Sequence, residues 1–195
     1  LKVDKGMDEE NNGVQLMKPN PGLEELLRQA IKKEVFGTKM RSVIKNANEN
    51  GVAAIVKQQF EIAKKIIAAK LVPIIEPEVD IHCETKAEAE TMLLEHLMDH
   101  IEQLSPDQKV LLKLTIPNEN NLFAPCMNHP NVIRVFALSG GYSRDEANSR
   151  LARNSGMVAS FSRALTEGLS AQQTDEEFNF ILDSSIESIY KASMT

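Results

Sequence analysis

Short apolar runs rich in β-branched residues alternate with longer amphipathic stretches along this chain. Each run is an almost continuous series of apolar positions, which is typical of a strand buried on both faces of a parallel sheet. The sequence therefore predicts strands at 36–44, 71–79, 109–116, 131–141 and 156–165. The opening LKVDKG (1–6) has the pattern of the tail of another strand.

Helical periodicity fills the intervals between these runs. Asn20 and Pro21 are typical of a helix start, and Ser143 with Glu146 and Thr174 with Glu177 have the spacing of capping boxes. The sequence predicts helices at 22–34, 47–69, 86–104, 147–154 and 178–192.

Strands and helices that alternate at this spacing indicate βα units and a parallel sheet. An open dinucleotide-binding sheet would carry a GxGxxG motif after a strand, and none is present. Polar residues lie instead in or after many different strands, as in the active sites of (β/α)8 barrels. We therefore predict an α/β protein with a (β/α)8 TIM barrel that lacks its first strands.

The length of 195 residues is short for such a barrel, which typically has about 250. We expect a single domain, 1–195, that runs from the end of barrel strand 3 to the C-terminal helix. Because the chain begins with Leu1 and not with methionine, we expect a fragment or an incompletely determined chain.

Composition narrows the functional classes. The net charge of −6 argues against nucleic acid as a partner, and no apolar run is long enough for a membrane span. The two cysteines, Cys83 and Cys126, form no CxxC pair. This cysteine usage predicts a reduced, cytoplasmic protein, and the lack of a spanning run predicts no membrane partner.

Lys113 is a lysine inside the apolar run 109–116. Burial disfavours an ammonium ion, and a neutral amine attacks carbonyl carbons to form a Schiff base. The alternative is a lysine at a strand end that points into solvent. We predict that Lys113 is a nucleophile.

Charged residues two apart project from one side of an extended strand. Glu76 and Glu78 have this spacing around Pro77, and Lys39 and Arg41 have it in the preceding run. The carboxylates suit general acid–base work, and the cations could tune them or bind an anionic substrate. Solvated surface charges are the alternative for both pairs.

Two polar clusters follow the last apolar runs, where barrel enzymes often bind phosphate. Glycines let backbone N–H groups approach an anion, and an arginine offers forked donors. The predicted phosphate-binding residues are Ser139, Gly140, Gly141, Ser162 and Arg163, with Ser160 in the same segment.

The histidines give no metal motif. His96 and His100 are four apart in a predicted amphipathic helix, and no HExxH pattern surrounds them. We therefore predict no metal ligands.

Six motifs in family order make the chain resemble a class I fructose-bisphosphate aldolase of the bacterial branch. They are LKVDKG, FGTKMRSVI, VPIIEPEVD, LLKLTIP, LSGGYS and FSRAL. The resemblance implies reversible cleavage of fructose 1,6-bisphosphate into dihydroxyacetone phosphate and glyceraldehyde 3-phosphate in glycolysis and gluconeogenesis, without a metal or another cofactor.

The resemblance also implies residue roles. Lys113 corresponds to the Schiff-base lysine, Glu76 to the proton-transferring glutamate and Lys39 to the second active-site lysine. Glu78 corresponds to a supporting carboxylate. The substrate-positioning and phosphate-binding positions are Arg41, Ser139, Gly140, Arg163 and Lys2. The family's aspartate on the first barrel strand has no counterpart in these residues.

Other functions stay open. Another Schiff-base barrel lyase would act on a different sugar phosphate, and a non-catalytic aldolase fragment would act as a binding protein. A metal-dependent aldolase would lose activity in a strong chelator. The family analogy also admits a homo-oligomer.

Overall fold

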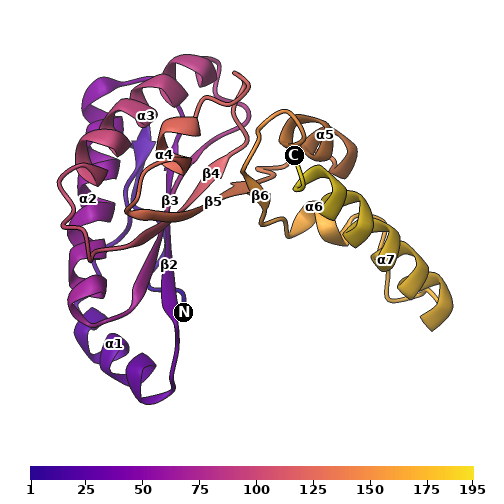
Figure 1. The fold of residues 1–195 in the computed structure, drawn as a ribbon, viewed down its shortest axis with the longest axis horizontal. Coiled ribbons are helices and arrows are strands. Elements are labelled where there is room, and N and C mark those ends of the chain that lie inside the picture. Colours follow the sequence, from indigo (N-terminus) through magenta and orange to yellow (C-terminus); the bar gives the residue numbers. More distant parts are fainter.

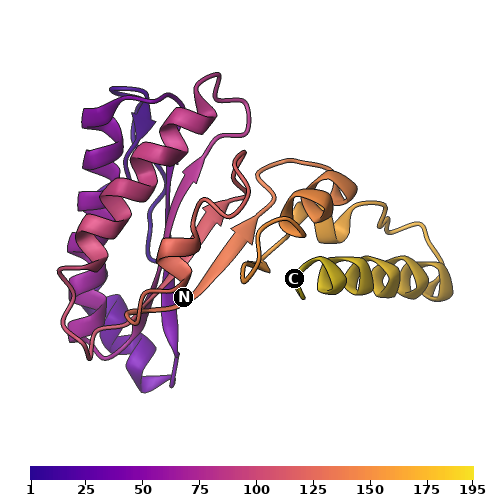
Figure 2. The same ribbon diagram turned by 45° about the horizontal axis from the view of Figure 1, so that its top comes forward.

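The computed structural model describes residues 1–195 as one six-stranded sheet with its helices packed largely against one face (Figure 1, Figure 2). The elements in chain order are β1 (Val14–Gln15), α1 (Leu23–Lys32), β2 (Gly37–Ile44), α2 (Glu49–Ala68), β3 (Val72–Val79), α3 (Lys86–Ile101), β4 (Val110–Thr115), α4 (Ala124–Met127), β5 (Val132–Leu138), α5 (Arg144–Leu151), β6 (Val158–Ala159), α6 (Arg163–Thr166) and α7 (Asp175–Ala192).

The strands lie in the order β1-β2-β3-β4-β5-β6, so consecutive strands are neighbours. Strands β2 to β6 pair in parallel, and β1 pairs with β2 in the antiparallel sense. A helix follows each of β2 to β5, and α2 and α3 cover one face of the sheet (Figure 2). This succession of βα units is the architecture of a partial (β/α)8 barrel.

The first residues of the chain extend the sheet beyond β2. Lys2 forms a parallel bridge with Lys39, and the N–H of Val3 donates to the carbonyl of Lys39 at 3.0 Å. The prediction of a strand tail at LKVDKG is therefore confirmed over its first residues. The prediction that this tail belongs to the third barrel strand stays a prediction.

Four of the five main predicted strands are confirmed as β2, β3, β4 and β5. The fifth prediction, 156–165, was wrong beyond Ala159, because the chain leaves the sheet there and α6 begins at Arg163. Strand β6 has a sheet neighbour on one side only, and its ladder with β5 is limited to the pairs of Val158 and Ala159. One short ladder does not hold a ten-residue strand.

The prediction of burial on both faces was wrong for β2. Thr38, Met40 and Ser42 are buried, whereas Lys39 and Arg41 between them remain partly exposed. Val52, Ile55 and other apolar residues of α2 are buried, and the helix packs on β2 and β3. Because the helices cover one face only, alternate side chains of β2 point to the other face, and these are the charged ones.

The predicted helices appear with shifted ends. Thr174 and Glu177 form a complete capping box at α7, whereas Ser143 accepts from the N–H of Glu146 without the reciprocal bond. Asn20 does not cap α1, since its amide donates instead to the carbonyl of Val3 at 2.8 Å. That contact ties the start of α1 to the N-terminal strand tail.

Helix α7 extends away from the sheet in both views (Figure 1, Figure 2). Phe180 is 74% exposed, and Ile186 and Tyr190 are also exposed along it. None of the helices combines the length and the apolar character needed to cross a bilayer.

The two cysteines are unpaired and buried. Burial raises the pKa of Cys126 to about 12, and its Sγ lies 3.7 Å from the sulfur of Met98. Because only the thiolate reacts, we expect iodoacetamide at pH 8 to modify Cys126 in the folded protein at least about a thousandfold more slowly than in urea. Peptide mass spectrometry over a time course measures both rates, and equal rates would show that the thiol is accessible.

Candidate active site

A polar cavity of about 390 Å³ opens at the carboxyl ends of the parallel strands. Five strands or the segments that follow them contribute its walls, which is how active sites are built in parallel α/β proteins. The lining residues are Arg41, Glu76, Glu78, Lys113, Leu138, Ser139, Gly140, Ser160, Ser162 and Arg163.

Glu76 lies between two lysines. Its Oε1 is 3.1 Å from Nζ of Lys113, and its Oε2 is 3.0 Å from Nζ of Lys39. The Glu76 side chain is 4% exposed, whereas those of Lys113 and Lys39 are 20% and 29% exposed. Oε2 is buried and makes no hydrogen bond, so its contact is the ion pair with the Lys39 ammonium.

The register of the strands explains this arrangement. Arg41 on β2 stands beside Glu76 on β3, so Lys39 lies one side-chain repeat earlier on the same face. The β3–β4 pairs end at Ile75 and Leu112, and Glu76 and Lys113 are the next residues on the two strands. The two side chains therefore leave the sheet at the same level.

Arg41 pairs with the other carboxylate of the EPE motif. Its Nε donates to Oε2 of Glu78 at 2.5 Å. Burial lowers the pKa of Arg41, but the hydrogen bond and charge of Glu78 outweigh it, and Glu76 and Asp4 add to the net rise. Arg41 is thus a fixed cation that compensates Glu78.

The opposite wall of the cavity carries the residues predicted to bind phosphate. Gly140 and Gly141 follow β5 with φ angles of +64° and +124°. A Cβ atom at Gly140 would lie 2.6 Å from Ile81, and one at Gly141 would lie 3.6 Å from Nη1 of Arg163. Only glycine fits this turn, which brings a bare backbone beside the Arg163 guanidinium.

Lys2 is placed differently from the other predicted residues. It is next to Lys39 in the sheet, but its ammonium pairs with Oδ1 of Asp4 at 3.1 Å, and it does not line the cavity. Its side chain is 62% exposed. The structure therefore brings Lys113, the glutamates, Arg41 and most of the predicted phosphate residues to the cavity. Lys39 and Gly141 lie beside its lining residues, and Lys2 is at the periphery.

Two residues near the cavity were missed by sequence reasoning. Asp4 is buried, with Oδ2 lacking a hydrogen bond, and its charge acts on Arg41. The two-residue spacing of Lys2 and Asp4 was the available signal for it. Leu138 also lines the cavity and has no polar signal in the sequence.

No group of three or more His, Cys, Asp or Glu side chains is arranged to hold a metal ion. His96 contacts Glu49 at 2.8 Å, and Nδ1 of His100 lies 3.0 Å from the carbonyl oxygen of His96.

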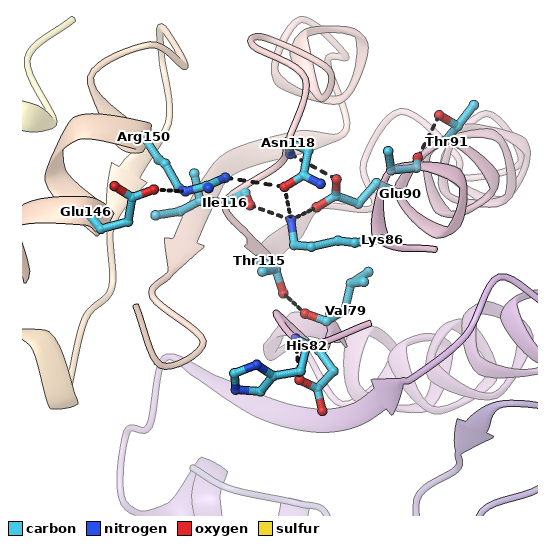
Figure 3. A network of polar contacts seen from close by, with 12 residues as sticks. Val79, His82, Lys86, Glu90, Thr91, Thr115, Ile116, Asn118, Glu146 and Arg150 are labelled. Carbon is cyan, nitrogen blue, oxygen red and sulfur yellow. Dashed lines mark hydrogen bonds and ion pairs between the residues drawn. The ribbon is translucent and has the colours of Figure 1, made fainter. Parts of the chain in front are cut away.

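A buried ion pair connects α3 with the segment that follows β4 (Figure 3). Lys86 at the start of α3 pairs with Glu90 and donates to the carbonyl of Ile116 at 3.0 Å. The N–H of Asn118 donates to Glu90 at 2.9 Å, and Arg150 of α5 donates to the side chain of Asn118 at 3.3 Å. This network fixes the segment that follows β4, three residues beyond Lys113.

Removing one member of this pair leaves the other charge buried. Burial lowers the pKa of Lys86 and raises the pKa of Glu90, in each case against the attraction of the partner. We expect Lys86→Met to lower the free energy of unfolding by about 3–5 kcal/mol, and the double variant Lys86→Met/Glu90→Leu to recover most of that loss.

Urea unfolding of the unsubstituted protein, Lys86→Met, Glu90→Leu and the double variant measures the coupling energy between the two side chains. Lys191→Met is the control, because Lys191 and Glu187 form the same i,i+4 pair on an exposed surface, and we expect no change there. Additive losses in the double variant would contradict a coupled buried pair.

Comparison with solved structures establishes the fold class. Plasmodium falciparum fructose-bisphosphate aldolase, solved with TRAP and a small-molecule inhibitor, superposes with a TM-score of 0.74 over 98% of this chain and 67% of that chain, at 20% identity. A Corynebacterium glutamicum protein superposes with a TM-score of 0.55 over 85% of this chain and 55% of its own, at 15% identity. The fold is that of a partial (β/α)8 barrel.

Sequence comparison gives the family. The chain is 64% identical over 195 residues to the class 1 fructose-bisphosphate aldolase of Synechocystis sp., and 56% identical to those of Porphyromonas gingivalis and Clostridium acetobutylicum. The matches cover 100% of this chain but 65–66% of these relatives, so the chain spans about two thirds of their length. No protein-family model matches. The chain belongs to the class 1 fructose-bisphosphate aldolase family.

Proposed function

We propose that this protein contributes the Schiff-base site of a class I fructose-bisphosphate aldolase. The observation that carries the proposal is the Lys113 amine 3.1 Å from the buried Glu76 carboxylate, in a cavity whose opposite wall holds Ser139, Gly140 and Arg163. The relatives named as aldolases support the substrate class, fructose 1,6-bisphosphate.

The proposed reaction begins with the amine. Lys113 passes a proton to Glu76 and, as the neutral amine, attacks the C2 carbonyl of the open-chain ketose. After a proton moves from the nitrogen to the oxygen, the carbinolamine loses its hydroxyl as water when Glu76 returns that proton to it. The product iminium carries one positive charge, as the lysine ammonium does. The ion pair with Glu76 therefore persists through this step, and Lys39 compensates the second carboxylate oxygen.

Carbon–carbon cleavage follows from the iminium. The electron pair of the C3–C4 bond moves to the iminium nitrogen while a water molecule takes the proton of the C4 hydroxyl, which releases glyceraldehyde 3-phosphate. The remaining enamine takes up a proton at C3, and hydrolysis of the new iminium frees dihydroxyacetone phosphate and Lys113. The glycine turn and Arg163 would hold the phosphate next to the ketone.

Borohydride trapping tests the proposal. The protein is incubated with dihydroxyacetone phosphate, reduced and digested, and the modified peptide is identified by mass spectrometry. We expect one reduced adduct, on Lys113, together with cleavage of fructose 1,6-bisphosphate. No adduct from folded protein would favour the non-catalytic binding role, and an adduct on another lysine would overturn the assignment of the nucleophile.

The choice of sugar phosphate separates the remaining enzyme candidates. Cations at both ends of the substrate are needed only if both phosphates are bound. Arg41 is a cation on the side of the cavity away from Arg163, and Lys2 lies beyond it at the periphery. We propose that fructose 1,6-bisphosphate is cleaved in preference to fructose 1-phosphate, in glycolysis and gluconeogenesis in the cytoplasm. Equal kcat/KM for both would favour another Schiff-base lyase.

A further inference from the structure

The backbone ladder between β3 and β4 ends where the site begins. The β3–β4 pairs stop at Ile75 and Leu112, whereas the β2–β3 pairs continue to Ile44 and Val79. Pro77 has no N–H to donate to a ladder, which suits the end of pairing on that side. The backbone of Glu76 is therefore paired on the β2 side alone.

A helix side chain reaches this backbone from the covered face of the sheet. Gln59 of α2 accepts a hydrogen bond at its Oε1 from the N–H of Glu76 at 2.8 Å. Its Nε2 donates to the hydroxyl of Ser42 on β2 at 2.5 Å. One amide thus joins α2 to both strands that carry the charged residues of the site.

The environment of Gln59 makes this amide unusual. The residue is fully buried, and its helical neighbours Ile55, Val56, Phe60 and Ala63 are buried apolar residues. Burying an amide costs free energy unless the amide is hydrogen-bonded, and an apolar residue of the same size would fill the space. Its two hydrogen bonds both lead to the site strands.

We propose that Gln59 is a positioning residue that fixes the Glu76 carboxylate between Lys39 and Lys113. The inference rests on the proposed function, in which Glu76 moves protons to and from the carbinolamine. A small rotation of the Glu76 backbone would swing the carboxylate at the end of its side chain. The 3.0 and 3.1 Å contacts with the two ammonium groups would then be lost together.

The variant Gln59→Met tests the role, because methionine keeps the length of the side chain and removes both hydrogen bonds. The adjacent Gln58→Met is the matched control, since the Gln58 amide also makes two hydrogen bonds, with the N–H and carbonyl of Met17 at 2.9 Å each. Gln58 holds the segment near β1 and does not line the cavity.

We expect Gln59→Met to lower kcat for fructose 1,6-bisphosphate by about 10- to 100-fold, with KM changed less than about threefold. The phosphate-binding groups lie on the other wall, so substrate binding is retained. Gln58→Met should leave both constants unchanged at a similar loss of thermal stability. Amide hydrogen exchange at Glu76, followed by NMR, should become faster in Gln59→Met alone.

Each result is decisive. Faster exchange at Glu76 with unchanged kcat overturns the positioning role while the aldolase function stands. An equal loss of kcat in both variants would mean that any weakening of α2 is responsible, and it also overturns the role. If the unsubstituted protein gives neither turnover nor a Lys113 adduct, the proposed function itself fails, and the positioning role fails with it.

Discussion

Replacing Lys113 with methionine is expected to lower kcat for fructose 1,6-bisphosphate by at least about 10⁴-fold and to abolish borohydride trapping. The reason is that Lys113 is the one lysine among the residues that line the cavity, and loss of a covalent nucleophile is among the largest effects that a single substitution has. Stopped and continuous assays of glyceraldehyde 3-phosphate release measure the loss.

Two further variants separate charge from nucleophilicity. Lys113→Arg keeps a cation beside Glu76 but is always protonated and cannot form the Schiff base, so we expect the same loss of turnover with less loss of stability. Lys109→Met is the control. Lys109 lies four residues before Lys113, and its ammonium donates to the carbonyl of Pro130, so this variant should behave like the unsubstituted protein. Trapping that persists in Lys113→Met would place the nucleophile elsewhere, with Lys39 as the nearest candidate.

The second large effect is expected at Glu76. Glu76→Gln keeps the size of the side chain but removes both the proton-transfer group and the negative charge between Lys39 and Lys113. We expect kcat to fall by about 10²- to 10⁴-fold, the range typical of general acid–base catalysis. The rate at which the trapped adduct forms in a single turnover should fall in parallel, because dehydration of the carbinolamine precedes the iminium.

Glu78→Gln is the matched comparison. Glu78 belongs to the same EPE motif but compensates Arg41, so its loss should act on kcat less than the loss of Glu76 does. Equal effects at both positions would mean that the acidic pair acts only through its total charge. Rapid-quench measurement of the adduct distinguishes the two results.

The residues that meet around Glu76 could be predicted because they follow simple periodicity. Lys39 and Arg41, and Glu76 and Glu78, are two apart on extended strands, and parallel strands bring their carboxyl ends to one edge. Lys113 was conspicuous as a charge in an apolar run. The register that sets Lys113 level with Glu76 was not visible, because it depends on the pairing of Ile75 with Leu112.

Features that depend on tertiary contacts escaped the sequence. The pairing of Lys2 with Asp4 depends on where a long flexible side chain finds its counter-charge, and the short β6 depends on its having one sheet neighbour. Gln59 had a weak signal, as an amide within an apolar helical stripe. Its partner, the backbone of Glu76, is 17 residues away, and only the packing of α2 on the sheet reveals it.

The prolines of β3 have a consequence for how the sheet moves. Pro73 and Pro77 have no N–H group, and the β3–β4 ladder is limited to two residue pairs, as few as in the β5–β6 ladder at the edge of the parallel sheet. Local opening of a folded protein occurs most readily where the fewest hydrogen bonds hold neighbouring segments together. Lys39 and Glu76 stand on one side of the β3–β4 ladder and Lys113 on the other. Opening of the sheet between β3 and β4 would therefore separate the amine from its carboxylate, and a bound substrate that spans the two strands would oppose it.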